Sequence, residues 1–252
     1  MTPRLLPFAT WLALSVVHLG SAGAPLPRGP SFRMETEMFH GDDPSPVARH
    51  KILFDAGVVY DIHAQGGRWS TVFDPTRGRV ILLDAETKVQ TQVATEELIK
   101  ATAQLAAAAK QAEKAEAFGL QATPQALPDN SGYEIGFGAL HYKMTTQTVQ
   151  NPAIAEAYHQ LAVWASRLNV LRKRGAPPFA RMALGERVAD DQRLPLHLTL
   201  TIREGLRKET FRAHHLVVER LSELDRKAID QVGNQLAAYR KVELGEFPSD
   251  SP

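Results

Sequence analysis

Apolar and polar residues alternate through residues 69–93, and this pattern predicts three short strands joined by two tight turns. Trp69 and Phe73 fall on the same face of the first strand. The segments 74–78 and 84–87 have the composition of turns, in which Pro presets φ and Gly allows a positive φ. Three strands are not stable alone, so further strands and a covering helix are expected.

The remaining elements follow from the same two periodicities. Alternation predicts further strands at 32–38, 47–54, 58–63, 133–137, 140–144, 196–202 and 208–218. Apolar residues three and four positions apart predict helices at 95–118, 151–174, 177–188 and 222–239. Short turns between the first six strands favour antiparallel neighbours.

Helix ends are marked by capping residues. Thr95 is the expected N-cap of the first helix and Asn151 that of the second, with Pro at the first helical position. Ser222 and Asp225 resemble a capping box for the last helix, in which Leu224 is expected to face inward.

The elements predict an α+β fold in which a curved antiparallel sheet, a half-barrel, wraps over a helix, with additional helices packed against it. The helix at 95–118 is expected to lie under the sheet, because its narrow, alanine-rich face allows a close approach. We expect one domain over 25–252, with a helical insertion around 151–190.

Residues 1–24 have the features of a secretory signal peptide, with Arg4 followed by a mostly apolar stretch and small residues at the cleavage position. Cleavage is expected after Ala24 or, because Pro25 would directly follow that cut, after Ala22. The apolar stretch is too short for a transmembrane span, and no later segment is long enough. The sequence therefore predicts an exported protein, periplasmic or extracellular.

Composition narrows the class of protein. The chain has 252 residues, 44% hydrophobic and 23% charged, which is typical of a soluble globular domain. Removing the leader with its single Arg leaves 28 basic and 28 acidic residues. This balance gives the chain no net positive charge with which to attract nucleic acid. The cations at 172–174 are interpreted as complements of a helix dipole. The absence of Cys excludes disulfides, thiolate zinc sites and a lipid-modified cysteine.

The order of these elements resembles that of the lipoprotein-carrier superfamily, the periplasmic lipoprotein chaperone and its outer-membrane receptor. The resemblance covers residues 32–118 and 194–218, and the segment 151–194 is additional. It implies an unclosed β-barrel around a helix, with an apolar cavity for acyl chains. No functional residue is carried over from that family. The chain also resembles uncharacterised exported bacterial proteins.

Large side chains at alternating strand positions are the candidate ligand-binding residues. They are Met34, Met38, Phe54, Tyr60, Trp69 and Phe73. These side chains either form plain core or line a cavity between sheet and helix, where Met and aromatic residues accept varied apolar ligands.

Candidate chemistry is sparse. None of the familiar hydrolase, zinc-protease or phosphate-loop motifs is present, and no cofactor or metal is expected. His214 and His215 must point to opposite faces of a strand, although one of them could pair with His197 on the neighbouring strand. Asp61 and His63 share a strand face and could form an acid–base pair, which needs a third orienting group.

The leading hypothesis is an exported, non-enzymatic carrier or binding protein for a lipid, an acyl chain or another apolar group. An alternative is a structural or partner-docking protein of the cell envelope, whose helix 151–174 presents Trp164 and Leu171 to an envelope protein. A hydrolase is a third hypothesis, favoured only if His and Asp or Glu side chains converge in one cleft.

Overall fold

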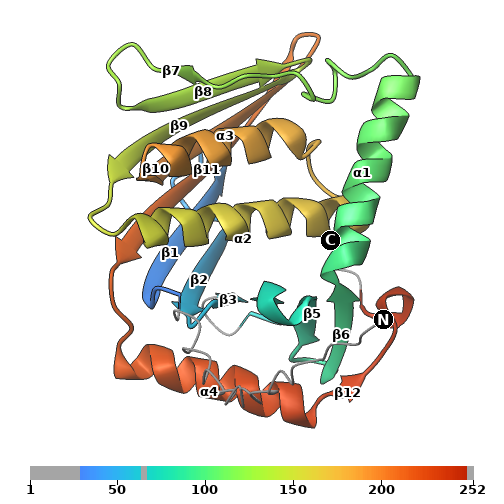
Figure 1. The fold of residues 1–252 in the computed structure, drawn as a ribbon, viewed down its shortest axis with the longest axis vertical. Coiled ribbons are helices and arrows are strands. Elements are labelled where there is room, and N and C mark those ends of the chain that lie inside the picture. Colours follow the sequence, from blue (N-terminus) through green and yellow to red (C-terminus); the bar gives the residue numbers. More distant parts are fainter. Residues whose placement is uncertain (1–28, 64–66, 249–252) are drawn as a thin grey trace, which may run out of the picture.

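The structure, a computed structural model, describes residues 29–63 and 67–248. Its main feature is one open, curved sheet of 12 strands (Figure 1). In chain order the strands are β1 (Phe32–His40), β2 (Ala48–Asp55), β3 (Val58–His63), β4 (Trp69–Asp74), β5 (Arg79–Asp84), β6 (Val89–Ala94), β7 (Gln125–Ala126), β8 (Gly132–Phe137), β9 (Leu140–Thr148), β10 (Arg193–Glu204), β11 (Arg207–Val218) and β12 (Arg240–Lys241). The expected signal peptide, residues 1–24, lies outside the described residues.

The spatial order is β12-β6-β5-β4-β3-β2-β1-β11-β10-β9-β8-β7. The strands predicted from alternation are all present, and β1 to β6 form the expected antiparallel series. β1 then pairs with β11, which joins the first part of the chain to the last. The two-residue strands β7 and β12 were not predicted, because so short a segment shows no periodicity. β12 runs parallel to β6. The sheet is therefore mixed, whereas the sequence analysis expected a purely antiparallel sheet.

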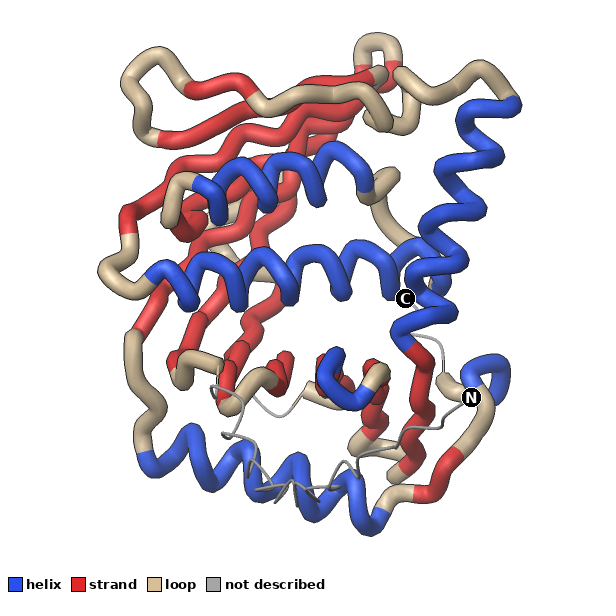
Figure 2. Tube along the Cα trace, viewed as in Figure 1, coloured by secondary structure: helices blue, strands red, loops and turns tan. Residues whose placement is uncertain are grey.

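Four α-helices and two short 3₁₀ helices complete the described part of the fold. They are α1 (Thr95–Gln111), α2 (Pro152–Leu171), α3 (Phe179–Asp190), α4 (Glu223–Ala238), η1 (Pro75–Arg77) and η2 (Leu244–Glu246). α2 and α3 lie side by side across the same face of the sheet (Figure 2). We call this the α2 face, and the opposite one the α4 face.

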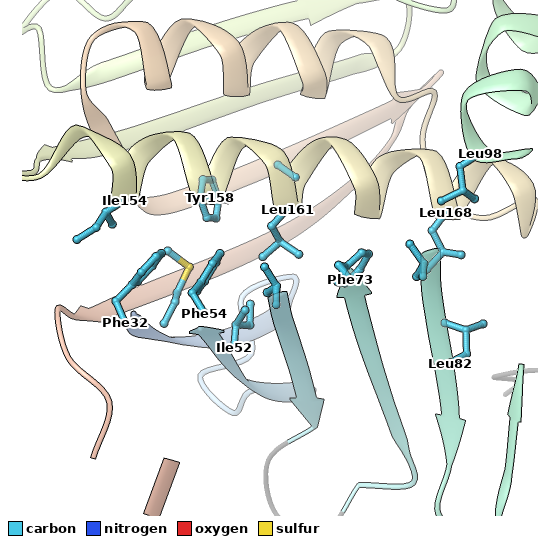
Figure 3. Packing of buried hydrophobic residues seen from close by; sticks show 14 of the residues in the cluster. Phe32, Ile52, Phe54, Phe73, Leu82, Leu98, Ile154, Tyr158, Leu161 and Leu168 are labelled. Atoms are coloured by element: carbon cyan, nitrogen blue, oxygen red, sulfur yellow. The ribbon is translucent and has the colours of Figure 1, made fainter. Parts of the chain in front are cut away.

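The helix that crosses the sheet is α2, and not the alanine-rich helix that was expected. The larger apolar residues of α2 point toward Phe32, Phe54 and Phe73 on the strands, and the rings of Phe32 and Phe54 stack 3.9 Å apart (Figure 3). The inward residues of α2 are Ile154, Tyr158, Leu161 and Leu168. Burying a side chain of this size contributes about 1.5–3 kcal/mol, whereas alanine buries far less apolar area.

α1 instead packs at the margin of the fold, against β6 and α2. Its buried residues include Leu98 and Ala109, and Leu98 contributes to the core under α2. Two details of its prediction were wrong. Ala94 occupies the N-cap position assigned to Thr95, and the helix ends at Gln111 and not near residue 118.

α4 covers the other face of the sheet. Val232 packs against Val72, Ile81 and Leu83, which alternate with the α2-face residues of the same strands. Leu224 was expected to face this core but is 72% exposed, because it lies in the first turn, on the side of the helix away from the sheet.

The capping box of α4 is present as predicted and is tied to the sheet. The amide of Asp225 donates to the Ser222 hydroxyl, and the Ser222 amide donates back to the Asp225 carboxylate at 2.9 Å. Asp225 is fully buried and also accepts from Arg33 of β1 at 3.2 Å, with the Lys51 ammonium of β2 at 3.6 Å. One side chain therefore begins the helix and fixes its position on the sheet.

Replacing Ser222 with Ala is expected to lower the free energy of unfolding by about 1 kcal/mol, the usual effect of losing an N-cap hydroxyl. The matched control is Ser45→Ala, at an exposed loop position. Urea unfolding followed by circular dichroism measures both variants. An S222A midpoint that coincides with that of S45A would show that the cap contributes nothing to stability.

Candidate functional site

Two clefts open between α2 and the sheet, one along each half of the helix. The apolar cleft has a volume of about 270 Å³ and is lined by residues that include Phe54, Val59, Phe73, Ala157, Leu161 and Trp164. The histidine cleft has a volume of about 360 Å³ and is lined by residues that include His50, Asp61, His63, Trp69, Phe73 and Arg172. Phe73 of β4 contributes to both walls, so the clefts are neighbours.

The apolar cleft follows one flank of α2. Its helical wall consists of residues spaced three and four apart between Ala153 and Trp164, which places them along one side of the helix. The opposite flank is occupied by α3, whose Gly185 lies against His159 and Ala162. On the sheet side, the turn at Gly57 (φ +83°) forms the rim. The result is an open groove with mainly apolar walls.

Three of the candidate ligand-binding residues line a cleft. Phe54 lines the apolar cleft, Trp69 the histidine cleft, and Phe73 both. Met34 is completely buried in the core beneath α2. The space between helix and sheet is therefore largely packed with side chains, and the clefts open at its margins.

Two of the candidate residues lie elsewhere. Met38 was expected inside but is 40% exposed, near the end of β1. Tyr60 packs with the cluster beneath α4, because it is opposite Leu53 and Val72 in the register and shares their face. Alternation identified that strand correctly, but it could not show which of its two faces meets α2.

The histidine cleft contains a hydrogen-bonded acid–base pair. His50 Nδ1 lies 2.7 Å from Asp61 Oδ1. The two-residue turn at Ala56 and Gly57, both with positive φ, sets the register that places His50 directly opposite His63, with ring centroids 5.1 Å apart.

The environment of His50 favours its charged form. Burial opposes protonation, but the hydrogen bond and the negative charge of Asp61 outweigh it, so the pKa of His50 is raised above 6.5. Because Asp61 engages Nδ1, Nε2 is the ring nitrogen that remains for a ligand. A His held in this way by a carboxylate can donate a hydrogen bond to an anion when protonated, or accept a proton when neutral.

Sequence reasoning paired Asp61 with His63 and missed His50. The structure supplies His50 as the group that joins them, from the neighbouring strand. The sequence contained the information needed to find His50, because pairing the residues of the two strands outward from the β2–β3 turn places residue 50 opposite residue 63. The convergence of His50 and Asp61 in one cleft meets the condition that the sequence analysis set for a hydrolase, so hydrolysis remains an alternative to ligand binding without chemistry.

The other histidines follow the predicted alternation. His214 and His197 form a cross-strand pair on the α4 face, with ring centroids 4.7 Å apart. His215 points to the α2 face, where its Nδ1 lies 2.9 Å from the Thr36 hydroxyl. Burial, with smaller contributions from neighbouring cations, lowers the pKa of His215 to about 3. Within residues 29–63 and 67–248, no group of three or more His, Cys, Asp or Glu side chains is arranged to hold a metal ion.

The residues proposed to face an envelope partner are not presented as an exposed patch. Trp164 and Leu171 are both partly buried and pack against the core beneath α2. The Arg167 guanidinium also lies over the Trp164 ring, 4.8 Å from its centroid. The docking hypothesis therefore loses the surface on which it was based.

In the part of the chain that the structure describes, no helix combines the length and apolar character needed to cross a bilayer. The chain matches no protein-family model and no curated protein.

Proposed function

We propose that this protein is an exported, non-enzymatic carrier or binding protein that holds one acyl chain, or a similar apolar group, in the apolar cleft. The observation that carries the proposal is the cleft itself. Its walls are formed mainly by aromatic and aliphatic side chains of both sheet and helix, among them Phe54, Leu161 and Trp164. A hydrocarbon chain suits such a groove better than a peptide does, because a peptide backbone needs hydrogen-bond partners that mainly apolar walls do not supply.

The driving force is burial of apolar surface. Each methylene group removed from water contributes about 0.8 kcal/mol, so six to eight groups would contribute roughly 5–6 kcal/mol before the cost of association. A cleft of about 270 Å³ lies near the lower limit for small-molecule sites, which favours a single chain over a larger ligand. The expected affinity is therefore moderate, as suits a protein that must release its ligand.

Two further observations support the proposal. An open, curved sheet crossed by a helix is the architecture that the lipoprotein-carrier resemblance implies. Here the crossing helix is α2, from the segment that lies outside the resemblance. The signal-peptide features of residues 1–24 support export.

Replacing Ala157 with Phe is expected to weaken binding of a fluorescent fatty acid at least tenfold. Ala157 lines the cleft on α2, so a phenyl ring at this position would occupy the space of the chain and leave the core contacts intact. The matched control, Ala108→Phe, adds the same ring at an exposed position of α1.

Fluorescence titration of the purified protein measures binding by the wild type and both variants, and urea unfolding confirms that each is folded. Saturable binding by wild type and A108F with its loss in A157F would support the proposal. Absence of saturable binding by the wild type, or equal affinities for wild type and A157F, would refute it.

A further inference from the structure

The interface between α2 and α3 contains buried nitrogen atoms that form no hydrogen bond. The two helices lie side by side over the sheet (Figure 2), and Arg181 of α3 donates from Nη2 to the Tyr158 hydroxyl of α2 at 2.8 Å. Its other terminal nitrogen, Nη1, is buried and has no partner among the described residues, and the same is true of Nδ1 of His159 on α2. Such atoms carry a desolvation cost unless a further group satisfies them.

Both nitrogens border the same small space, beside Gly185 of α3. A methyl group attached to Gly185 would lie 3.2 Å from His159 Nδ1, 3.3 Å from Arg181 Nη1 and 4.0 Å from the Cβ of Ala162. Glycine leaves this space open because it carries no side chain. The space is of the order of one methyl group, so it suits a single atom or a monatomic ion and is too small for a phosphate or carboxylate group.

The charge of Arg181 is not balanced by a neighbouring carboxylate. Within residues 29–63 and 67–248, no Asp or Glu pairs with its guanidinium. Arg181 is the third residue of α3, a helix that has no acidic residue in its first turn and no side-chain N-cap. Because the N-terminus of a helix is its positive end, the helix adds to the positive potential at this interface.

The charge of Arg181 also affects buried side chains on the sheet beneath it. Burial lowers the pKa of His215 to about 3, and the largest electrostatic contribution to this shift comes from Arg181. Burial raises the pKa of Tyr142, and Arg181 acts in the opposite direction. An uncompensated cation in such surroundings is costly, and a bound anion would remove that cost.

We propose that the α2–α3 interface binds a monatomic inorganic anion such as chloride, held between Arg181 Nη1 and His159 Nδ1. Arg181 supplies the compensating charge and one hydrogen bond, and His159 supplies a second from the tautomer that carries its proton on Nδ1. The ion would join the two helices that pack together over the sheet. Neither residue lines the apolar or the histidine cleft, so the inference is independent of the acyl ligand.

The dependence of stability on chloride tests this site. Only the folded state would bind the ion, so a dissociation constant of about 20 mM would raise the folding equilibrium constant about tenfold in about 0.2 M chloride. Urea unfolding compares sodium chloride with sodium gluconate, whose anion is too large for the space, at equal ionic strength. The ³⁵Cl NMR line width measures binding directly, because chloride held by a protein relaxes faster than free chloride.

The key variants are Arg181→Gln, which removes the positive charge, and Gly185→Ala, whose methyl group fills the space. Both are expected to lose the tenfold chloride effect and the excess ³⁵Cl line width of the wild type. Arg187→Gln is the matched control for the first, because Arg187 lies on the same helix and pairs with Asp191 at 3.1 Å. Gly233→Ala is the control for the second, since a methyl group there would meet no atom within 4 Å.

The two salts separate a bound anion from a purely structural role of Arg181. If Arg181 holds an anion, R181Q will lower the folding equilibrium constant about tenfold more in chloride than in gluconate. General salt effects act on wild type and variant alike and cancel in this comparison. The proposal is overturned if R181Q has the same effect in both salts, or if G185A keeps the line width of the wild type and G233A; a water molecule would then satisfy Arg181. The line widths of G185A and G233A decide the matter even if R181Q does not fold.

Discussion

Replacing Asp84 with Asn is expected to lower the free energy of unfolding by about 3 kcal/mol, the lower end of the range for breaking a buried ion pair. The side chain of Asp84 is completely buried at the end of β5. Its two oxygens accept from the Arg68 guanidinium at 2.8 and 2.7 Å, from the Thr87 hydroxyl at 2.6 Å and from the Glu86 amide at 2.9 Å. An amide replaces one acceptor with a donor and removes the charge that these donors surround.

Urea unfolding of D84N against Asp230→Asn, an exposed position on α4, measures this effect. The control is expected to differ from wild type by less than about 0.5 kcal/mol, as surface substitutions usually do. A D84N variant as stable as D230N would show that the hydrogen bonds around Asp84 only offset its desolvation.

The same carboxylate predicts a loss of stability in acid. Burial opposes ionisation, but the hydrogen bonds from Arg68, Thr87 and Glu86 and the charge of Arg68 lower the pKa of Asp84 from 3.8 to about 2. Because the pKa of Asp84 is lower in the folded state than in the unfolded state, its ionised side chain contributes about 2 kcal/mol to the free energy of unfolding at pH values above the unfolded-state pKa. This contribution is lost as the pH falls from about 5 toward 2. The stability difference between wild type and D84N should therefore shrink over that interval.

Asp74, at the other end of the β4–β5 hairpin, is also buried and has a lowered pKa, owing to hydrogen bonds from Arg77, Thr76 and Arg79. The contribution of Asp74 to stability is also lost as the pH falls, so the free energy of unfolding of both wild type and D84N will decrease in acid. Only their difference isolates Asp84. Sequence analysis placed both aspartates in turn segments, which agrees with their positions at the two ends of the hairpin.

Local patterns were sufficient to predict the strands and most helix boundaries. Alternation placed β1 to β6, and Asn151 and Ser222 marked the starts of α2 and α4 correctly. These signals are local, because capping and pleating depend on residues a few positions apart. The fold class, an α+β arrangement with an open curved sheet, followed from the order of the elements.

The choice of helix beneath the sheet depended on tertiary packing. The segments 95–118 and 151–174 both show an amphipathic pattern. The second carries Tyr158, Leu161 and Leu168 where the first carries mostly alanines, and the larger buried area decides in its favour. Periodicity shows that a helix has an apolar face, but it does not show which surface of the protein that face packs against.

The candidate site was predictable only in part, for the same reason. Phe54, Trp69 and Phe73 were identified by size and alternation, but the division into an apolar and a histidine cleft comes from where α2 crosses the strands. His50 entered the site through the β2–β3 register, which relates positions 13 residues apart. Such pairings become visible in a sequence only after the turn between two strands is known.

Phe73→Ala is expected to have the largest effect on stability of the variants proposed, about 3–4 kcal/mol, the usual result of truncating a buried Phe. Phe73 is 3% exposed and belongs to the core beneath α2. It also borders both clefts, so its removal would open the wall between them. Urea unfolding measures the loss, with Phe211→Ala as control, because Phe211 of β11 is only partly buried and stacks on His40.

Phe73→Leu separates the two roles of this side chain. Leu keeps most of the apolar volume and is expected to cost less than about 1.5 kcal/mol, so this variant remains folded even if F73A does not. If Phe73 also forms part of the wall of the apolar cleft, F73L should weaken binding of the fluorescent fatty acid less than A157F does, because leucine keeps most of that apolar wall in place. A loss below about 1 kcal/mol in F73A would instead mean that α2 settles onto the sheet and closes the space, because a persistent cavity carries a larger penalty.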